Sequence, residues 1–503
     1  MIAFVVLLLT NLSLLIPLVS PLHHLVFLGR RNVNSQDVYT YVSFIEQSRQ
    51  GAFLFKNLYT SETQTPSLFR PSYLVIGKFA AITGISSIVA YHVSRIILSI
   101  IFFAILYLFL SHFFADKQKR LVAFALITTA SGIGYLVYPW IPNSIDLWVP
   151  EAIPFLTLFE APHFILSLIL LITGFHFFLT YLKDNKTKTM IWSSVAFIFL
   201  SFEHPFDLAI VVPTVFVTAL WNRLSLQKAF AVSVATGIGL VYQVAAVYTN
   251  PILMSWQIQN VLPSPPPIAY LTGFGLLLPF SLIGLETFFI DLAKEQKLLI
   301  VWIAITALLL YAPVGVQRRF IEGVQIPLAI AAIYGMYTIV DRLKPSLKST
   351  AITIMILILS LSSLFMVYQD VNTIQADTAN SYYYHLSQQE VDGILWLGRR
   401  TDAHDVILTN WFISNLIPGF IGRTVYIGHR IQTIDFDKKI GNVNQFLHET
   451  NNAKAESFLK TNRITYIYFG IGDSLLSYGF KPDTKSYLSR VYASNGVMVY
   501  KVK

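Results

Sequence analysis

The chain has 503 residues, of which 54% are hydrophobic and only 13% are charged. Soluble domains carry roughly twice that charged fraction, so the composition excludes an ordinary soluble protein and predicts a polytopic membrane protein with a more polar tail. The net charge of +9 is attributed to orientation signals in membrane loops, and not to nucleic-acid binding. Because there is no cysteine, disulfides, thiolate metal sites and a cysteine nucleophile are excluded.

The first apolar run, Ile2 to Val19, has no basic segment before it and no small-residue cleavage site after it. We therefore expect a retained first helix rather than a cleaved signal peptide. The apolar runs together predict about eleven membrane-spanning helices. They are expected at residues 3–19, 93–114, 121–138, 164–181, 190–202, 208–221, 229–248, 268–290, 298–311, 326–340 and 351–368.

The connections between these helices differ in charge. Lys and Arg gather at 116–120, 183–188, 222–228, 294–297 and 342–348, whereas 139–159, 203–207 and 250–267 contain none. Because cytoplasmic loops carry an excess of Lys and Arg, we expect the basic connections and the N-terminus in the cytoplasm. The first outer loop (21–91) and the C-terminal tail would then be extracytoplasmic. This topology requires that the apolar run Tyr73–Ile82 lies outside the membrane and does not span it.

The tail, residues 371–503, is richer in charged residues, Asn and Thr than the transmembrane domain of residues 1–370. Short β-rich runs predict strands at 406–409, 424–427, 464–469, 488–492 and 497–502, and residues 453–460 predict a helix. This alternation predicts a small α/β domain. The expected fold class is therefore mainly α, a polytopic transmembrane helix bundle with a small C-terminal extracytoplasmic α/β domain.

Asp37 is the candidate residue around which the chain is organised. It is a lone acid in the stretch Asn34–Tyr41, just beyond the first apolar run, and an amphipathic run to Gln50 follows it. An ionisable group near membrane depth is costly, which makes each one on the outer face a functional candidate. The predicted topology gathers these residues on that face: Asp37, Glu46, Arg70, His92, Arg95, Asp146, Glu151, Glu160, His163, Glu203, His204, Asp207, Arg318, Arg319 and Glu322.

Arg318 and Arg319 lie in a short outer connection, Gln317–Phe320, where the topology rule disfavours cations. Arginine presents a planar fork of donors that matches pairs of phosphate oxygens. We therefore predict an anionic ligand at this loop. Lipid headgroups or carboxylates of the tail are the alternative partners.

Two further outer segments combine acids with histidines. Glu160 and His163 are three positions apart, so they share one face of the following helix if it begins by Glu160. The alternative is a helix cap at the membrane interface. Glu203–Asp207, which contains His204, interrupts two apolar runs, and broken helices at membrane depth occur where they line a cavity. The alternative is a plain reversal at a proline turn.

Sequence motifs of other enzyme classes are absent. There is no phosphate-binding loop, which argues against an ATP-driven transporter, and no H-E-x-x-H. Gln36 precedes Asp37, so there is no acidic pair to hold a divalent cation. His23 and His24 are adjacent, which points their rings apart and disfavours a metal site. We expect no cofactor; scattered carboxylates could still bind a metal, but the sequence does not support a catalytic one.

An acid, Asp37, in a long first outer loop, followed by apolar helices and an outer tail, resembles the GT-C superfamily of polytopic glycosyltransferases. Protein O-mannosyltransferases and aminoarabinose transferases are members. Leu68–Tyr73 followed by Gly84 is similar to the proline-led segment of that family, and Gln317–Phe320 with Pro327 resembles its arginine-bearing loop. Asn415–His429 is similar to the C-terminal part of uncharacterised bacterial members, without an assignable chemistry.

The resemblance implies an integral-membrane hexosyltransferase that moves a sugar from a polyprenyl-phosphate donor to an extracytoplasmic acceptor hydroxyl with inversion. It implies Asp37 as the catalytic base and Arg318 with Arg319 as ligands of the carrier phosphate. The expected partners are this donor, membrane lipid, and a glycan, lipid or protein acceptor. Further candidate substrate-binding residues are Glu160, His163, His204 and Arg70.

Three other functions stay open. A lipid-linked sugar flippase or another transporter would place polar residues near the midplane of the membrane, with inverted repeats. An oligosaccharide polymerase or ligase would share the outer face and the arginines. A receptor or scaffold would need only the tail.

Overall fold

The computed structural model describes residues 1–503 except 23–24, 69, 225, 290–291, 378–382 and 472–478. The protein is mainly helical, with 67% helix and a small sheet. It contains two compact units. The first comprises residues 1–13, 93–245 and 261–371, and the second comprises 14–92, 246–260 and 372–503.

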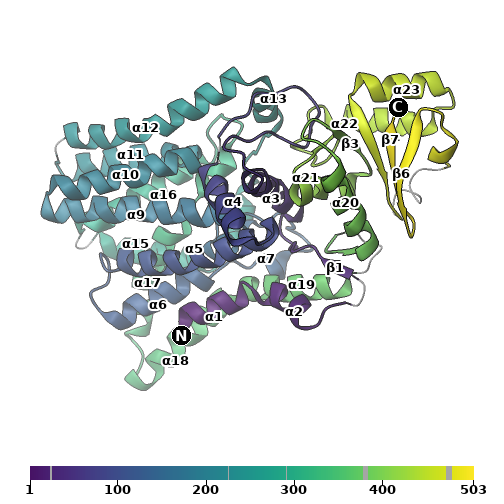
Figure 1. The fold of residues 1–503 in the computed structure, drawn as a ribbon. Coiled ribbons are helices and arrows are strands. Elements are labelled where there is room, and N and C mark those ends of the chain that lie inside the picture. Colours follow the sequence, from purple (N-terminus) through teal and green to yellow (C-terminus); the bar gives the residue numbers. More distant parts are fainter. Residues whose placement is uncertain (23–24, 69, 225, 290–291, 378–382, 472–478) are drawn as a thin grey trace. The chain divides into compact units, whose positions relative to one another are not determined.

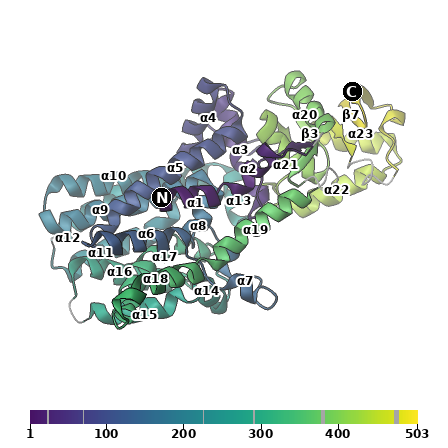
Figure 2. The ribbon, with the colours of Figure 1, turned by 90° about the horizontal axis from the view of Figure 1, so that it is seen from below.

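The first unit is a helix bundle in which α9, α10, α11 and α16 lie side by side in both Figure 1 and Figure 2. Proline occupies the first turn of several of its helices, where its missing N–H costs nothing. The elements lying wholly or mostly in this unit are α1 (Ile2–Leu9), α5 (Ser87–Leu110), α6 (Lys117–Thr129), α7 (Gly134–Val137), η1 (Ile145–Leu147), α8 (Pro154–Glu160), α9 (Pro162–Asp184), α10 (Thr187–Glu203), η2 (Pro205–Asp207), α11 (Leu208–Trp221), α12 (Leu226–Thr249), α14 (Pro267–Phe274), α15 (Leu277–Phe288), α16 (Lys294–Leu309), η3 (Gln317–Ile321), α17 (Gln325–Val340), α18 (Pro345–Leu359) and α19 (Leu361–Ala376).

The apolar helices identify a multi-pass membrane protein. Within the described residues, five helices are long and apolar enough to cross a membrane, or up to eight if each of three bent pairs is one span. The predicted count of about eleven is not confirmed. Helices such as α11, with 14 residues, and α16, with 16, are shorter than a full span, since 14 residues rise about 21 Å against a hydrocarbon core of about 30 Å.

Three apolar runs predicted as single helices are each broken in two by a bend of more than 40°. Residues 268–288 of one run fall in α14 and α15, which meet at 83° around Gly275, a residue with a φ of +49°. Only glycine adopts such a conformation without steric cost. Residues 3–19 form α1 and α2, and residues 351–368 fall in α18 and α19. Ile290, the predicted end of one run, lies outside the described residues.

Basic side chains of the first unit gather at one end of the bundle. Lys183 at the end of α9 lies 2.7 Å from Glu295 at the start of α16. Lys119 lies over the Tyr337 ring of α17 at 4.6 Å, and Lys297 lies over the Trp221 ring of α11 at 5.7 Å. The ends of α9 and α11 and the start of α16, which are far apart in the sequence, therefore lie together. The membrane topology stays a prediction.

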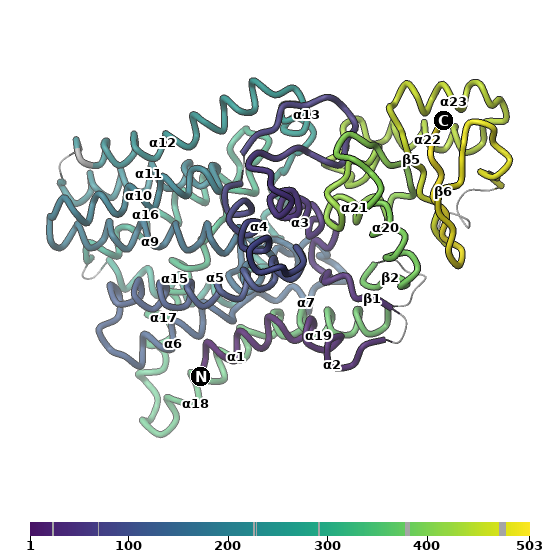
Figure 3. The backbone as a smooth tube through the Cα atoms, in the orientation of Figure 1, coloured from purple at the N-terminus to yellow at the C-terminus, as the bar shows by residue number. Residues whose placement is uncertain are grey.

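The second unit joins four helices and a strand from the segments around 14–92 and 246–260 to the C-terminal residues 372–503. Strands β1 and β2 pair antiparallel (Figure 3). Helix α4, with 13 residues, contains the run Tyr73–Ile82 and rises only about 20 Å, which is too short for a span. The elements are α2 (Leu12–Val19), β1 (Leu25–Phe27), α3 (Ser35–Arg49), α4 (Pro71–Thr83), α13 (Pro251–Gln259), β2 (His385–Ser387), α20 (Gln388–Arg400), β3 (Val406–Leu408), α21 (Trp411–Ile421), β4 (Thr424–Val425), α22 (Phe436–His448), α23 (Asn452–Thr461), β5 (Ile464–Phe469), η4 (Pro482–Thr484), β6 (Leu488–Ser494) and β7 (Val497–Val502).

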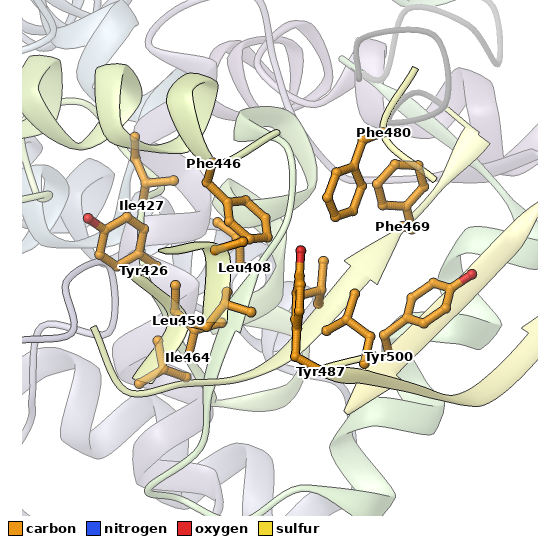
Figure 4. Packing of buried hydrophobic residues seen from close by; sticks show 14 residues of the cluster. Leu408, Tyr426, Ile427, Phe446, Leu459, Ile464, Phe469, Phe480, Tyr487 and Tyr500 are labelled. Carbon is orange, nitrogen blue, oxygen red and sulfur yellow. The ribbon is translucent and has the colours of Figure 1, made fainter. Parts of the chain in front are cut away.

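The larger sheet has the strand order β4-β3-β5-β7-β6, with β3 parallel to β4 and β5 and the other pairs antiparallel. Ile467 and Phe469 belong to a core shared with Phe446 of α22 and Leu459 of α23 (Figure 4). Tyr468, between them in sequence, points to the other face, where its hydroxyl donates to the Glu390 carbonyl at 3.0 Å. Helices therefore cover both faces.

The secondary structure predicted for the tail is confirmed. The predicted strands at 464–469 and 497–502 coincide with β5 and β7, and the other three overlap β3, β4 and β6. The predicted helix at 453–460 lies within α23. The boundary between predicted domains 1–370 and 371–503 stays a prediction, because the tail shares its compact unit with residues 14–92 and 246–260.

Candidate functional site

Asp37 lies in the first turn of α3, so the polar loop expected around it is helical from Ser35 onward. Asn34 precedes the helix in the left-handed conformation, with a φ of 45°, and its carbonyl accepts the Asp37 N–H at 2.9 Å. A carboxylate in a first turn interacts favourably with the helix dipole. The Asp37 side chain is 38% exposed, so it is anchored and still accessible.

His429 is the partner of Asp37. Its Nε2 lies 2.8 Å from Asp37 Oδ1, and its side chain is only 5% exposed. Its other ring nitrogen, Nδ1, accepts the Ile431 N–H at 3.2 Å. A neutral imidazole carries a single proton, so this acceptor role places the proton on Nε2, from which it is donated to Asp37.

The turn that carries His429 is fixed by hydrogen bonds to the stretch around Tyr59. The Thr433 hydroxyl donates to the Tyr59 carbonyl at 2.8 Å and accepts the Gly428 N–H at 3.0 Å. The Tyr59 ring meets the His429 ring edge-on at 6.2 Å, and its hydroxyl donates to the Asn415 carbonyl at 3.1 Å. The imidazole is therefore held in place before any substrate binds.

The other outer-face candidates of the second unit have structural partners or no contact with Asp37. Glu46 accepts hydrogen bonds from Arg49 at 2.7 Å and from Ser87 at 2.6 Å, and His92 Nε2 lies 2.9 Å from the Gly29 carbonyl. Arg70 stands at the start of α4. Within the described part of the chain, no hydrogen bond or ion pair joins Arg70 to Asp37. Phe69, in the proline-led segment, lies outside the described residues.

In the first unit, the two predicted arginines have different neighbours. Arg319 Nη1 lies 2.9 Å from Glu151 Oε1, and the Arg318 guanidinium lies over the Trp148 ring at 4.5 Å. Burial opposes ionisation of the Glu151 carboxyl, but the charges of Arg319 and Arg318 outweigh it and hold the pKa of Glu151 below its usual value. A phosphate at Arg319 would therefore have to compete with a buried carboxylate.

Next to the arginines, the turns η2 and η3 bring a histidine and two acids together. His204 Nδ1 lies 2.9 Å from Asp207 Oδ1 and 2.8 Å from Glu322 Oε2. All three side chains are buried. The break Glu203–Asp207 therefore contributes two side chains to a polar cluster inside the bundle, more than a plain proline turn would require.

Glu160 and His163 do not share a helix. Glu160 ends α8, Ala161 is extended with a φ of −133°, and α9 begins at Pro162. The predicted common helical face is therefore wrong, because the chain breaks between the two residues. Both side chains are buried. Two other candidates have structural roles: Arg95 donates to the Leu158 carbonyl at 2.7 Å, and Asp146 accepts the Gly134 N–H at 3.0 Å.

Asp37 and Arg70 belong to the second unit, whereas Arg318, Arg319, Glu160, His163 and His204 belong to the first. Their functional roles stay predictions. The residue that the sequence did not single out is His429, which ends the stretch Asn415–His429. No local pattern marks it, because its partner is in another part of the chain.

No protein-family model and no curated protein matches the chain, but solved structures do. The oligosaccharyltransferase of Archaeoglobus fulgidus, tethered to an acceptor peptide with the NVT sequon, gives a TM-score of 0.56 at 13% identity over 100% of this chain and 74% of that one. ArnT from Cupriavidus metallidurans bound to undecaprenyl phosphate gives 0.53 at 11% identity over 98% of this chain and 97% of that one. Both are GT-C glycosyltransferases. The chain has the GT-C fold.

A third GT-C structure, the arabinofuranosyltransferase AftD from Mycobacteria, has a TM-score of 0.51 at 12% identity. The match covers 99% of this chain and 41% of the AftD chain. The GT-C resemblance predicted from Asp37, the apolar helices and the arginine loop is thus confirmed as a fold. Identities this low carry the GT-C architecture and not the roles of single residues.

Proposed function

We propose that this protein is an inverting membrane glycosyltransferase that moves a sugar from a polyprenyl-phosphate donor to an acceptor hydroxyl. The observation that carries the proposal is the accessible Asp37 carboxylate, oriented by His429, in a chain with the GT-C fold. Structures of similar fold contain dolichol-phosphate or undecaprenyl phosphate, which supports a lipid-phosphate donor.

In the proposed reaction, Asp37 takes the proton of the acceptor hydroxyl while the acceptor oxygen attacks the anomeric carbon. The bond from that carbon to the phosphate oxygen breaks, and the carrier phosphate leaves with the electron pair. His429 donates to Oδ1 and fixes the carboxylate plane, so the second oxygen can face the acceptor. A positioned general base contributes about 10²–10⁴-fold to the rate.

The substitution Asp37→Asn tests the base. It keeps the side-chain shape and can still accept the His429 proton, so we expect transfer to fall by about 10²–10⁴-fold with unchanged thermal stability and donor binding. The measurement is transfer of label from a panel of radiolabelled polyprenyl-phosphate sugars by purified protein. Asp437→Asn, at an exposed carboxylate of the same unit, is the matched control and should transfer at the wild-type rate. A fully active Asp37→Asn protein would refute the assignment.

We also propose that Arg318 and Arg319 bind the carrier phosphate. Glu151 must be neutralised in the test, because Arg319→Ala alone would leave a buried carboxylate without its partner. Glu151→Gln should keep or improve donor affinity. Adding Arg318→Ala and Arg319→Ala to it should weaken donor binding about 10- to 100-fold, the contribution of charge-assisted hydrogen bonds. Equal donor affinity in these two proteins would exclude the phosphate role.

A lipid-linked oligosaccharide is the second candidate donor, because the oligosaccharyltransferase of Archaeoglobus fulgidus is among the similar folds. The donor panel therefore includes a monosaccharide and an oligosaccharide on the same carrier. Consumption of the oligosaccharide alone would favour a ligase or oligosaccharyltransferase. Consumption of neither would favour a transporter.

A further inference from the structure

His204, Asp207 and Glu322 form a buried cluster that the proposed reaction does not use. The three come from two turns of the first unit: His204 precedes η2, Asp207 is its last residue, and Glu322 follows η3. One ligand-type atom from each lies within 4.8 Å of the others. Their side chains are 1%, 0% and 2% exposed, respectively.

Two carboxylates converge on the same ring nitrogen. His204 Nδ1 forms a hydrogen bond with Asp207 Oδ1 at 2.9 Å, whereas Glu322 Oε2 lies 2.8 Å from the same nitrogen without hydrogen-bond alignment. One N–H cannot satisfy two acceptors that approach from different directions. Asp207 Oδ2 is also buried without a hydrogen-bond partner. Buried carboxylate oxygens left in this way are costly unless a cation binds them.

The net charge of the cluster also favours a bound cation. Arg319 is already paired with Glu151, so its charge does not neutralise Asp207 and Glu322. An imidazolium at His204 would leave the three groups with a net charge of −1, taking each carboxylate as ionised. A divalent cation bound to a neutral imidazole and two carboxylates gives a neutral set, and burial favours a neutral set.

We propose that His204, Asp207 and Glu322 bind one divalent transition-metal ion. Imidazole nitrogen and carboxylate oxygen are both ligands of Zn²⁺, and three protein ligands are typical of zinc sites that keep a further position for water or substrate. Mg²⁺ and Ca²⁺ are disfavoured, because they prefer oxygen ligands throughout.

The surroundings orient the ligands. The Ser167 hydroxyl of α9 donates to Glu322 Oε1, which leaves Oε2 directed at the cluster. The His204 ring is held edge-on by Phe206 at 5.5 Å and by Phe164 at 6.3 Å. Such neighbouring contacts fix ligand orientation and tune metal affinity.

The test is the metal content of the purified full-length protein, measured by mass spectrometry after expression with added Zn²⁺. We expect one Zn²⁺ per chain, lost in Glu322→Gln and in His204→Ala. Ser167→Ala should bind the ion about 10- to 100-fold more weakly in competition with a chelator. Asp146→Asn, at another buried carboxylate of the same unit that accepts the Gly134 and Ser144 protons, is the matched control and should keep the ion.

Thermal unfolding with and without a chelator gives a second measurement that does not depend on the yield of a variant. The chelator should lower the melting temperature of the wild type and of Asp146→Asn, and leave Glu322→Gln unchanged. Wild-type protein without stoichiometric metal would overturn the proposal in favour of an imidazolium paired with two carboxylates. Equal metal content in wild type and Glu322→Gln would overturn it in favour of an adventitious ion. Neither measurement uses a sugar donor, so failure of the proposed glycosyl transfer would not affect the result.

Discussion

Lys439 of α22 pairs with Glu62, two residues that are far apart in the sequence of the second unit. Lys439 Nζ lies 2.7 Å from Glu62 Oε1 and 3.1 Å from the Thr60 hydroxyl. Burial opposes ionisation of Glu62, but its hydrogen bonds to Lys439 and Thr60 and the lysine charge outweigh this and hold the pKa of Glu62 below its usual value. Burial lowers the pKa of Lys439.

This pair makes the stability of the second unit depend on acid pH. A carboxylate with a lowered folded-state pKa contributes stability that is present above its ordinary pKa, 4.5, and is lost as the pH falls through the folded value. We expect Glu62→Gln to destabilise the protein by about 1 kcal/mol at pH 7, a modest figure because the Glu62 side chain is a third exposed. Its unfolding temperature should also fall less than that of the wild type between pH 5 and pH 3.

The exposed ion pair between Lys460 and Glu456 is the control. Glu456→Gln removes a carboxylate at a similar N–O distance, 2.6 Å, but its lysine partner is 59% exposed, whereas Lys439 is 8% exposed. The stability of this variant should therefore stay within about 0.5 kcal/mol of the wild type. Parallel curves for wild type and Glu62→Gln across the acid range would contradict the role given to Glu62.

At the scale of elements, α15 and α17 pack through small residues. A Cβ added to Gly284 would lie 1.8 Å from the Ala331 carbonyl oxygen, and one added to Gly335 would lie 2.1 Å from the Phe280 carbonyl oxygen. The Ser281 hydroxyl also donates to the Leu328 carbonyl at 2.8 Å. Membrane helices associate by such close backbone contact and interhelical hydrogen bonds, because lipid supplies no hydrophobic force between them.

We therefore expect Gly284→Ala to destabilise the first unit by about 1–3 kcal/mol, since the backbones of α15 and α17 must separate. Thermal unfolding in detergent measures this loss of stability. Gly237→Ala in α12 is the matched control, because an added Cβ there meets no atom within 4 Å and alanine favours a helix. If both variants melt at the same temperature, close packing at Gly284 does not hold the two helices together.

The broken helices show why hydropathy alone misjudges element boundaries. An apolar run records that a segment avoids water, but a bend such as that at Gly275 leaves its hydrophobicity unchanged. The polar breaks were easier to predict, since Glu203–Asp207 interrupts the apolar run with charges. The cluster that His204 of this break forms with Glu322 could not be predicted, because Glu322 belongs to a turn elsewhere in the chain.

At the scale of the whole molecule, the gathering of Lys119, Lys183 and Lys297 at one end of the bundle supports a single cytoplasmic end. The length of α4 supports the same topology, because a short helix at 71–83 leaves the number of crossings before α5 at one. On this basis we expect Asp37 on the extracytoplasmic side and the α9–α10 connection in the cytoplasm.

The natural absence of cysteine makes this prediction simple to check. In intact cells, a membrane-impermeant maleimide should label Asp37→Cys and should label Lys186→Cys only after permeabilisation. Residue 37 is partly exposed and residue 186 is exposed, so the reagent can reach both positions. Labelling of residue 37 only after permeabilisation would reverse the proposed orientation and remove the base from the outer face.

The sequence by itself determined the membrane character of the protein, most helix positions and the strands of the tail, because hydrophobicity, chain length and β-propensity act locally. It also singled out Asp37 and the two arginines, since isolated charges stand out in apolar surroundings. Only the tertiary structure paired Asp37 with His429, Arg319 with Glu151, and His204 with Glu322. These contacts join residues from separate parts of the chain, so no spacing in the sequence records them, and it is their geometry that sets the chemistry.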